Sequence, residues 1–120
     1  EPADSSAQQI ATDHATEAAA RDWLRLTDSG DWAASYENTG DQFRRLNTLE
    51  LWRNTSQDAR TPLGPMLARD AIGYQSVNAP PRGYRIVTFR TYFTNRPEAK
   101  ETITLEREDD AWKVVGYIIE

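Results

Sequence analysis

The last third of the chain most constrains its fold. From Met66 to Ile119 the sequence reads as four strand-like runs in succession, whereas the first half reads almost wholly as helix. Runs of helices followed by runs of strands are typical of an α+β domain. We therefore expect N-terminal helices packed on a strongly curved four-stranded antiparallel sheet, a cone-shaped architecture that commonly encloses a pocket.

Length and charge narrow the class of protein. The 120 residues suit one domain, which we place at residues 6–120, with residues 1–5 as a flexible mature N-terminus. Acidic residues outnumber basic ones by 19 to 14 without any Lys/Arg stripe, so we expect no nucleic-acid partner. No segment is apolar enough to span a membrane. The polar start resembles a chain from which a signal peptide was removed, which predicts a periplasmic or secreted protein, although an artificial boundary would look the same.

Helical spacing of apolar residues predicts three helices in the first half. The first is expected from about Ser6 to Asp28. Asp31 is an N-cap for a short second helix, and Thr48 caps a third that ends before Pro62.

The second half has a period of two. Turn chemistry at residues 79–83 and 95–98 separates the runs, and Gly73 is the cheapest place for a bulge or bend. We expect strands over residues 67–78, 84–94, 100–108 and 112–119.

The last hairpin can be read in register if Asp109 and Asp110 form a two-residue loop. The expected cross-strand pairs are Glu106 with Lys113, Leu105 with Val114, Ile103 with Gly116, and Glu101 with Ile118. The face toward the helices then carries Ile103, Leu105, Trp112, Val114 and Ile118. Val115 and Tyr117 lie on the other face, which makes them candidates for an interface.

Glu101 falls on the apolar face in this register. A buried carboxylate must find a partner or raise its pKa. A four-residue loop in the preceding hairpin would place Tyr92 opposite Glu101, whereas a five-residue loop would place Phe93 there. We favour the second because it buries more apolar surface, and Arg69 can then supply the positive charge.

Other chemistry lacks a motif. His14 is the only histidine and the chain has no cysteine, so we expect no metal site. The glycines are too scattered to form a phosphate loop, and we expect no cofactor.

A longer pattern resembles a known family. It comprises Trp23-Leu24, residues 28–36, Trp52, residues 60–64 with Arg69, residues 101–105 and residues 112–117. Over about residues 15–119 it resembles a family of secreted bacterial proteins catalogued as the domain of unknown function numbered four thousand and nineteen. The resemblance implies export and a relation to the nuclear-transport-factor-two-like superfamily, with its cone-shaped, cystatin-like fold. That superfamily includes enzymes and non-catalytic modules, so the resemblance implies no activity.

Two functions stay open from the sequence. The first is a non-catalytic exported module, with an outer sheet face for homodimerisation and an interior that binds a small acidic or amphipathic molecule or stays filled. The second is a pocket enzyme of ketosteroid-isomerase or polyketide-cyclase type, in which Glu101 moves a proton. We favour the first, and an interior in which Glu101 is closed off and paired with Arg would argue against the second. The interior is expected to be lined by Tyr36, Trp52, Arg69, Tyr92 and Glu101.

Overall fold

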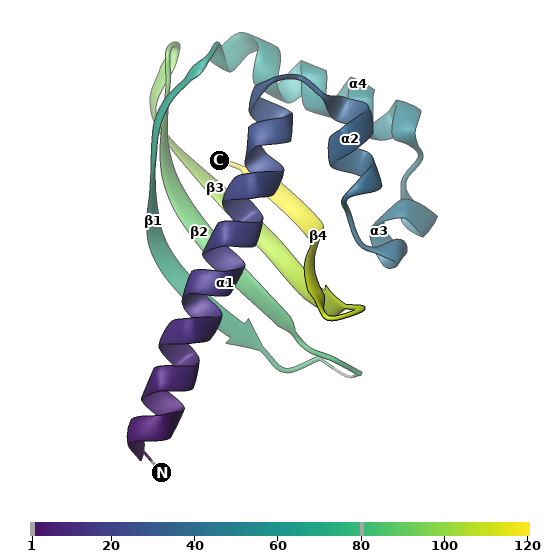
Figure 1. Ribbon diagram of the computed structural model, residues 1–120. Coiled ribbons are helices and arrows are strands. Elements are labelled where there is room, and N and C mark those ends of the chain that lie inside the picture. Colours follow the sequence, from purple (N-terminus) through teal and green to yellow (C-terminus); the bar gives the residue numbers. More distant parts are fainter. Residues whose placement is uncertain (1, 80) are drawn as a thin grey trace.

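The computed structural model describes residues 2–79 and 81–120, with their side chains from residue 7 onward. The four strands pair in sequence order, β1-β2-β3-β4, as one antiparallel sheet that follows the helices (Figure 1). This confirms the α+β class. The elements are α1 (Pro2–Asp28), α2 (Trp32–Glu37), α3 (Asp41–Leu46), α4 (Leu49–Arg60), the 3-10 turn η1 (Thr61–Leu63), β1 (Met66–Val77), β2 (Tyr84–Phe93), β3 (Arg96–Glu108) and β4 (Ala111–Ile119).

The helix boundaries follow from local chemistry. Asp31 and Thr48 cap α2 and α4 as expected, each accepting a hydrogen bond from the backbone three residues on, at 3.1 Å. Gly30, with a φ of 76°, ends α1 in the left-handed region that favours glycine. The sequence predicted a flexible segment at residues 1–5. In the structure α1 begins at Pro2, and Glu1 lies outside the described residues.

The short helix α3 was not expected from the sequence. It has six residues and buries none of them fully, so it lacks the apolar stripe by which a helix is recognised in a sequence. Its position is fixed from outside, since the Tyr36 hydroxyl donates to the carbonyl of Asn47 at 2.6 Å.

The core lies between α1 and one face of the sheet, which we call the inner face (Figure 1). The tryptophans of α1, α2 and α4 pack together there, with Trp23 and Trp52 centroids 5.6 Å apart. The sheet is open, with β1 and β4 at its edges, and is not strongly curled, so the expected cone-like curvature is wrong. α1 covers the inner face, and buried side chains from the helices and strands fill the space between them. The buried aliphatic and phenyl core residues are Ala20, Leu24, Val87, Phe89, Ile103, Leu105 and Val114.

The β3–β4 hairpin confirms part of the expected register. Asp109 and Asp110 form the two-residue loop with φ values of 52° and 62°, and Glu106–Lys113 and Leu105–Val114 pair as expected. Beyond Val115 the register shifts by one residue.

The shift corrects two expected pairs and exchanges the faces of two residues. Ile103 pairs with Tyr117 rather than Gly116, and Glu101 pairs with Ile119 rather than Ile118. Tyr117 therefore packs in the core and Ile118 faces outward, 59% exposed, the reverse of the expectation.

A tertiary contact accompanies this bulge. The backbone N–H of Gly40 donates to the carbonyl of Val114 at 2.9 Å, which brings the loop before α3 against the β4 edge. A Cβ on Gly40 would lie 2.8 Å from Val115 Cγ1, so only glycine fits this approach without a shift. Such a contact cannot be read from the strand sequence alone.

The β2–β3 hairpin has neither expected register. Its loop is Thr94–Asn95, β3 begins at Arg96, and Phe89 lies opposite Glu101. Pro97 lies within the strand at an irregularity of the pairing, where its missing N–H costs no ladder bond. The sequence interpretation took this proline as part of a turn. The bulge expected near Gly73 is confirmed, between Ala71 and Gly73 of β1.

Candidate functional site

Five polar side chains form a closed ring between the inner face and the helices. They come from the last residues of α1 and α4 and from three strands, and we call them the charge ring: Asp28, Arg60, Arg69, Glu101 and Tyr117. Two guanidinium groups and two carboxylates make the ring formally neutral.

Arg69 is the centre of the ring. Its Nε donates to Glu101 Oε1 at 2.8 Å, and its two Nη atoms donate to the Asp28 carboxylate at 2.8 and 3.0 Å. The second contact is bidentate, the geometry that suits a guanidinium best. Arg69 therefore ties β1 to β3 and to the end of α1.

Arg60 and Tyr117 close the ring on its other side. Arg60 Nη2 donates to Asp28 Oδ1 at 2.7 Å, and its Nη1 donates to the Tyr117 hydroxyl at 3.3 Å. The Tyr117 hydroxyl in turn donates to Glu101 Oε2. From β2, Thr91 Oγ1 donates to Glu101 Oε1 at 2.5 Å. All four strands and two helices thus meet at one hydrogen-bonded cluster.

The electrostatics of the ring hold its charges in place. Burial alone would raise the pKa of the Asp28 carboxyl, but the hydrogen bonds and charges of Arg69 and Arg60 outweigh burial and keep that pKa below the ordinary value of 3.8. Burial, and then the charge of Glu101, raise the pKa of the Tyr117 hydroxyl well above 10.0. Tyr117 therefore stays a neutral donor to Glu101 at physiological pH.

Glu101 is closed off from solvent. Its exposed fraction is 0%, and both carboxylate oxygens accept hydrogen bonds from Arg69, Thr91 and Tyr117. A general acid or base must reach a proton on a bound substrate, and Glu101 is absent from the lining of five surface pockets among the described residues. The arrangement holds four strands and two helices together, with the Glu101 carboxylate closed off inside it.

The structure brings together only two of the five residues expected to line an interior pocket. Arg69 and Glu101 pair, whereas Trp52 packs against Trp23 and donates its indole N–H to Ser35 Oγ at 2.9 Å. Tyr36 anchors α3 instead.

Tyr92 and the two interface candidates lie elsewhere. Tyr92 belongs to the alternate residues of β2 that face away from the core. Val115 lies half-buried beside Gly40, and Tyr117 belongs to the ring rather than to an outer face.

Sequence reasoning missed Asp28, Arg60 and Thr91 as members of this cluster. Asp28 and Arg60 were explained as the ends of helices, which they are. The available signal was their place at the ends of two helices that enter the same layer. The pairing of Asp28 with Arg60 depends on the angle at which α1 and α4 cross. The spacing of apolar residues in the sequence does not give that angle.

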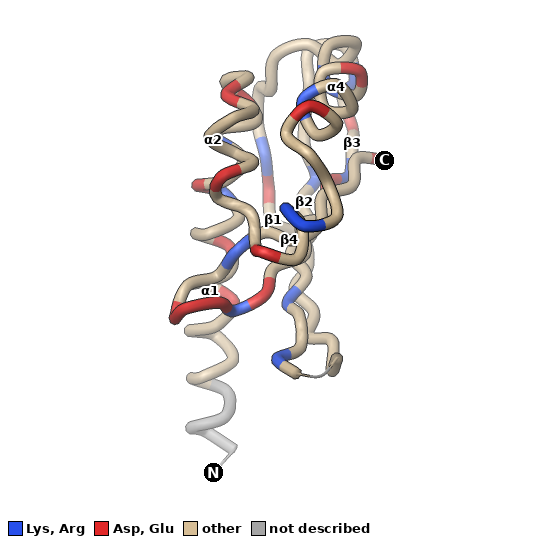
Figure 2. Tube along the Cα trace, turned by 90° about the vertical axis from the view of Figure 1, so that its right-hand side faces the viewer, with Lys and Arg blue, Asp and Glu red and all other residues tan. Residues whose placement is uncertain are grey.

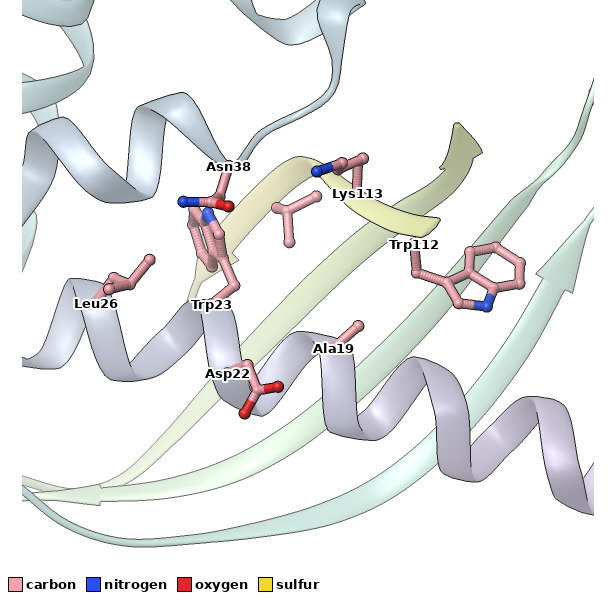
Figure 3. Close-up of a pocket in the computed structure, with 8 residues that line it drawn as sticks. Ala19, Asp22, Trp23, Leu26, Asn38, Trp112 and Lys113 are labelled. Atoms are coloured by element: carbon pink, nitrogen blue, oxygen red, sulfur yellow. The ribbon is translucent and has the colours of Figure 1, made fainter. Parts of the chain in front are cut away.

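A separate groove opens between α1 and the β4 edge (Figure 3). Its volume is about 280 Å³. Figure 3 shows Asn38 and Lys113 on one side and Asp22 and Ala19 of α1 on the other, with Trp112 at one end. The lining residues are Ala19, Asp22, Trp23, Leu26, Asn38, Trp112, Lys113 and Val114.

The charged residues of the described chain are of mixed sign. Acidic and basic residues are interspersed along the chain in Figure 2, without a segment of basic residues alone. Within residues 2–79 and 81–120, no group of three or more His, Asp or Glu side chains is placed to hold a metal ion. The described helices include none with the length and apolar character needed to cross a bilayer.

One protein-family model matches most of the chain. A family model described as a protein of unknown function, DUF4019, matches residues 19–117. The chain belongs to the DUF4019 family. The matched segment runs from the middle of α1 to Tyr117, so the DUF4019 domain includes every residue of the charge ring. A search of curated proteins gave no match.

Proposed function

We propose that this DUF4019 protein is a non-catalytic, exported module that self-associates through the outer face of its sheet. The observation that carries the proposal is the contrast between a closed interior and an outer sheet face that exposes isoleucines. Ile118 and Ile72 are 59% and 49% exposed on that outer surface. Isolated exposed apolar residues are ordinary, but several on one sheet face are typical of an interface.

The outer face is defined by the strand register. Every second residue of β2 is buried, and the residues between them face outward. The pairing of neighbouring strands carries this outward face across to β1, β3 and β4. Thr88 pairs with Thr102, and Thr102 pairs with Ile118. Small β-branched side chains dominate these rows and leave a flat surface, which suits a second sheet better than a small ligand. The central outer residues are Ile86, Thr88, Thr102, Thr104 and Ile118.

The size of this face approaches that of a standard dimer interface. Strands of about ten residues at about 3.3 Å each, and four strands at about 4.8 Å spacing, give about 600 Å². A standard stable interface buries about 800 Å² on each partner. The α3 helix borders the same face at a groove of about 220 Å³, and Leu46 on its rim is 73% exposed, which extends the area.

Charge on the outer face is self-complementary. One row across the sheet runs Asp70, Arg90, Lys100 and Glu120, with acidic groups at both edges and basic groups in the middle. A copy related by a two-fold axis presents the same patch, so an offset of the two sheets places acids against bases. Complementary charges at a rim fix the register more than they add affinity.

Two finer expectations belong to the same proposal. The family resemblance supports export, and a long helix across an antiparallel sheet supports a relation to the nuclear-transport-factor-two-like superfamily. Fractionation of cells that express the full-length gene tests export. Recovery of the protein outside the cytoplasm is the expected result, and recovery in the cytoplasm alone would reject it.

The self-association test uses two isoleucines of equal exposure. Ile118 on the outer face is 59% exposed and Ile10 on α1 is 58% exposed, so Ile118→Glu and Ile10→Glu are matched variants. Light scattering across a protein concentration series should give two 13.7 kDa chains for the wild type and for Ile10→Glu. Ile118→Glu should give one chain with an unchanged circular dichroism spectrum. A wild-type protein that stays monomeric, or equal dissociation of both variants, would reject the outer-face dimer.

The register explains why Tyr117 is unsuitable for this test. A charge at Tyr117 would enter the ring beside Glu101 and unfold the protein, so loss of association would carry no information.

A further inference from the structure

The groove between α1 and the β4 edge has an apolar floor and one uncompensated cation. Trp23 and Leu26 of α1 and Val114 of β4 supply apolar lining, and Trp112 stands at one end (Figure 3). The apolar lining of this groove lies on the α1 side of the sheet, and Lys113 reaches it from the β4 edge.

Lys113 is the cation of this groove. Among the described residues it makes no salt bridge, whereas the only other lysine, Lys100, lies 3.9 Å from Glu120. The cross-strand neighbour of Lys113, Glu106, pairs instead with Arg82 at 3.2 Å.

The acidic residue of the groove is already neutralised. Asp22 pairs with Arg25 one turn along α1, so Lys113 is the charged lining residue that makes no salt bridge among the described residues. Asn38 stands beside it (Figure 3). Its side-chain amide donates one hydrogen bond to the Ala34 carbonyl at 2.8 Å, and an amide carries a second N–H for another acceptor.

We propose that this groove binds a small amphipathic carboxylate, with the anionic group on Lys113 and Asn38 and the apolar body along Trp23 and Val114. A volume of about 280 Å³ is at the lower limit for a ligand site and suits a molecule of about ten non-hydrogen atoms. An aromatic acid fits best, because its ring packs on the indole and aliphatic floor.

The charged rim determines the ligand class. Arg107 lies over the Trp112 ring at 5.8 Å, so a second cation stands near the end of the groove. Lys113 in the lining, Arg107 near one end and an apolar floor favour an anion that carries apolar surface over a neutral polar solute or a cation.

The test uses phenylacetate as the probe and phenylacetamide as its uncharged match. Titration of each into the ¹⁵N-labelled protein, followed through the indole N–H signals of Trp23 and Trp112, measures binding in the groove. Phenylacetate should give saturable shifts with a dissociation constant of about 1 mM, because so small a ligand has little binding energy to offer. Phenylacetamide should bind at least about fivefold more weakly.

The two lysines of the chain provide the matched variants. Lys113→Gln should weaken phenylacetate binding about fivefold. Lys100→Gln should bind phenylacetate as tightly as the wild type does. The proposal is overturned if phenylacetate gives no saturable shift, if phenylacetamide binds equally well, or if both variants weaken binding equally. Loss of phenylacetate binding in Lys113→Gln together with the wild-type mass in light scattering distinguishes failure here from failure of the dimer.

Discussion

The inner face of the sheet carries Glu101 and Arg69 within the charge ring, whereas the outer face carries Ile118 and Ile72 open to solvent. The inner face thus combines the apolar core with a buried cluster of paired charges, and the outer face combines exposed isoleucines with exposed charged residues. The charges that a reader of the sequence would assign to a catalytic pocket are all paired with one another. The exposed isoleucines lie on the opposite face, among outward-facing threonines.

The difference between the faces indicates which substitutions should lower the free energy of unfolding most. A buried ion pair adds little net stability compared with a well-packed apolar pair, because desolvation offsets the Coulomb attraction. Removal of one partner is costly, because it leaves a buried charge without compensation. Variants of the inner face should therefore report on folding, and variants of the outer face on association.

The largest expected effect is at Arg69. Arg69→Met leaves Glu101 with only Thr91 and Tyr117 as partners in a fully buried site, so unfolding should cost about 3–5 kcal/mol less free energy than in the wild type. Urea denaturation followed by circular dichroism measures this. Arg25→Met, which removes an exposed pair on α1, should change the free energy by less than about 1 kcal/mol. Equal effects of the two variants would contradict the difference between buried and exposed charge.

A smaller effect is expected at the tyrosine of the ring. Tyr117→Phe removes the hydroxyl that links Arg60 to Glu101 and should lower the free energy of unfolding by about 1–3 kcal/mol. Tyr92→Phe on the outer face is its matched control and should have almost no effect on stability. A ring role for Tyr117 is wrong if the two substitutions give the same urea midpoint.

These two tyrosines also show how far the sequence can be read. The period of two placed every strand within a few residues and gave the Asp109–Asp110 loop with its first two cross-strand pairs. It failed at Val115, because the bulge there accompanies a contact with Gly40 from another part of the chain. That single extra residue moved Tyr117 from the expected outer face into the ring.

The candidate site was predictable to a similar extent. Alternation and the cost of a buried carboxylate predicted Glu101 inside the domain and Arg69 as its counter-ion. Asp28 and Arg60 could not be added, because their pairing depends on where α1 and α4 end in space. Whether the interior was hollow depended on the same packing, and hence the structure was needed to distinguish a pocket from a closed ring.

The smallest expected effect is a dependence of stability on acid pH. The pKa of Asp28 is lower in the folded protein than the ordinary value of 3.8, so its contribution is present above that value and is lost as pH falls through the folded pKa. Asp28→Asn removes this contribution, and its stability should fall less steeply than that of the wild type below pH 4. Urea midpoints collected from neutral to acid pH measure the slope. Parallel curves would show that Asp28 does not interact with Arg60 and Arg69 as described.

The most direct test of the structural role of the ring is a double-mutant cycle between Arg69 and Glu101. The single variants Arg69→Met and Glu101→Leu and the double variant are compared by urea denaturation. If the two side chains form a closed structural pair, the double variant loses at least about 2 kcal/mol less than the sum of the single losses, because no unpaired charge remains at that contact. Strictly additive losses would contradict the account, since Arg69 and Glu101 would then act independently.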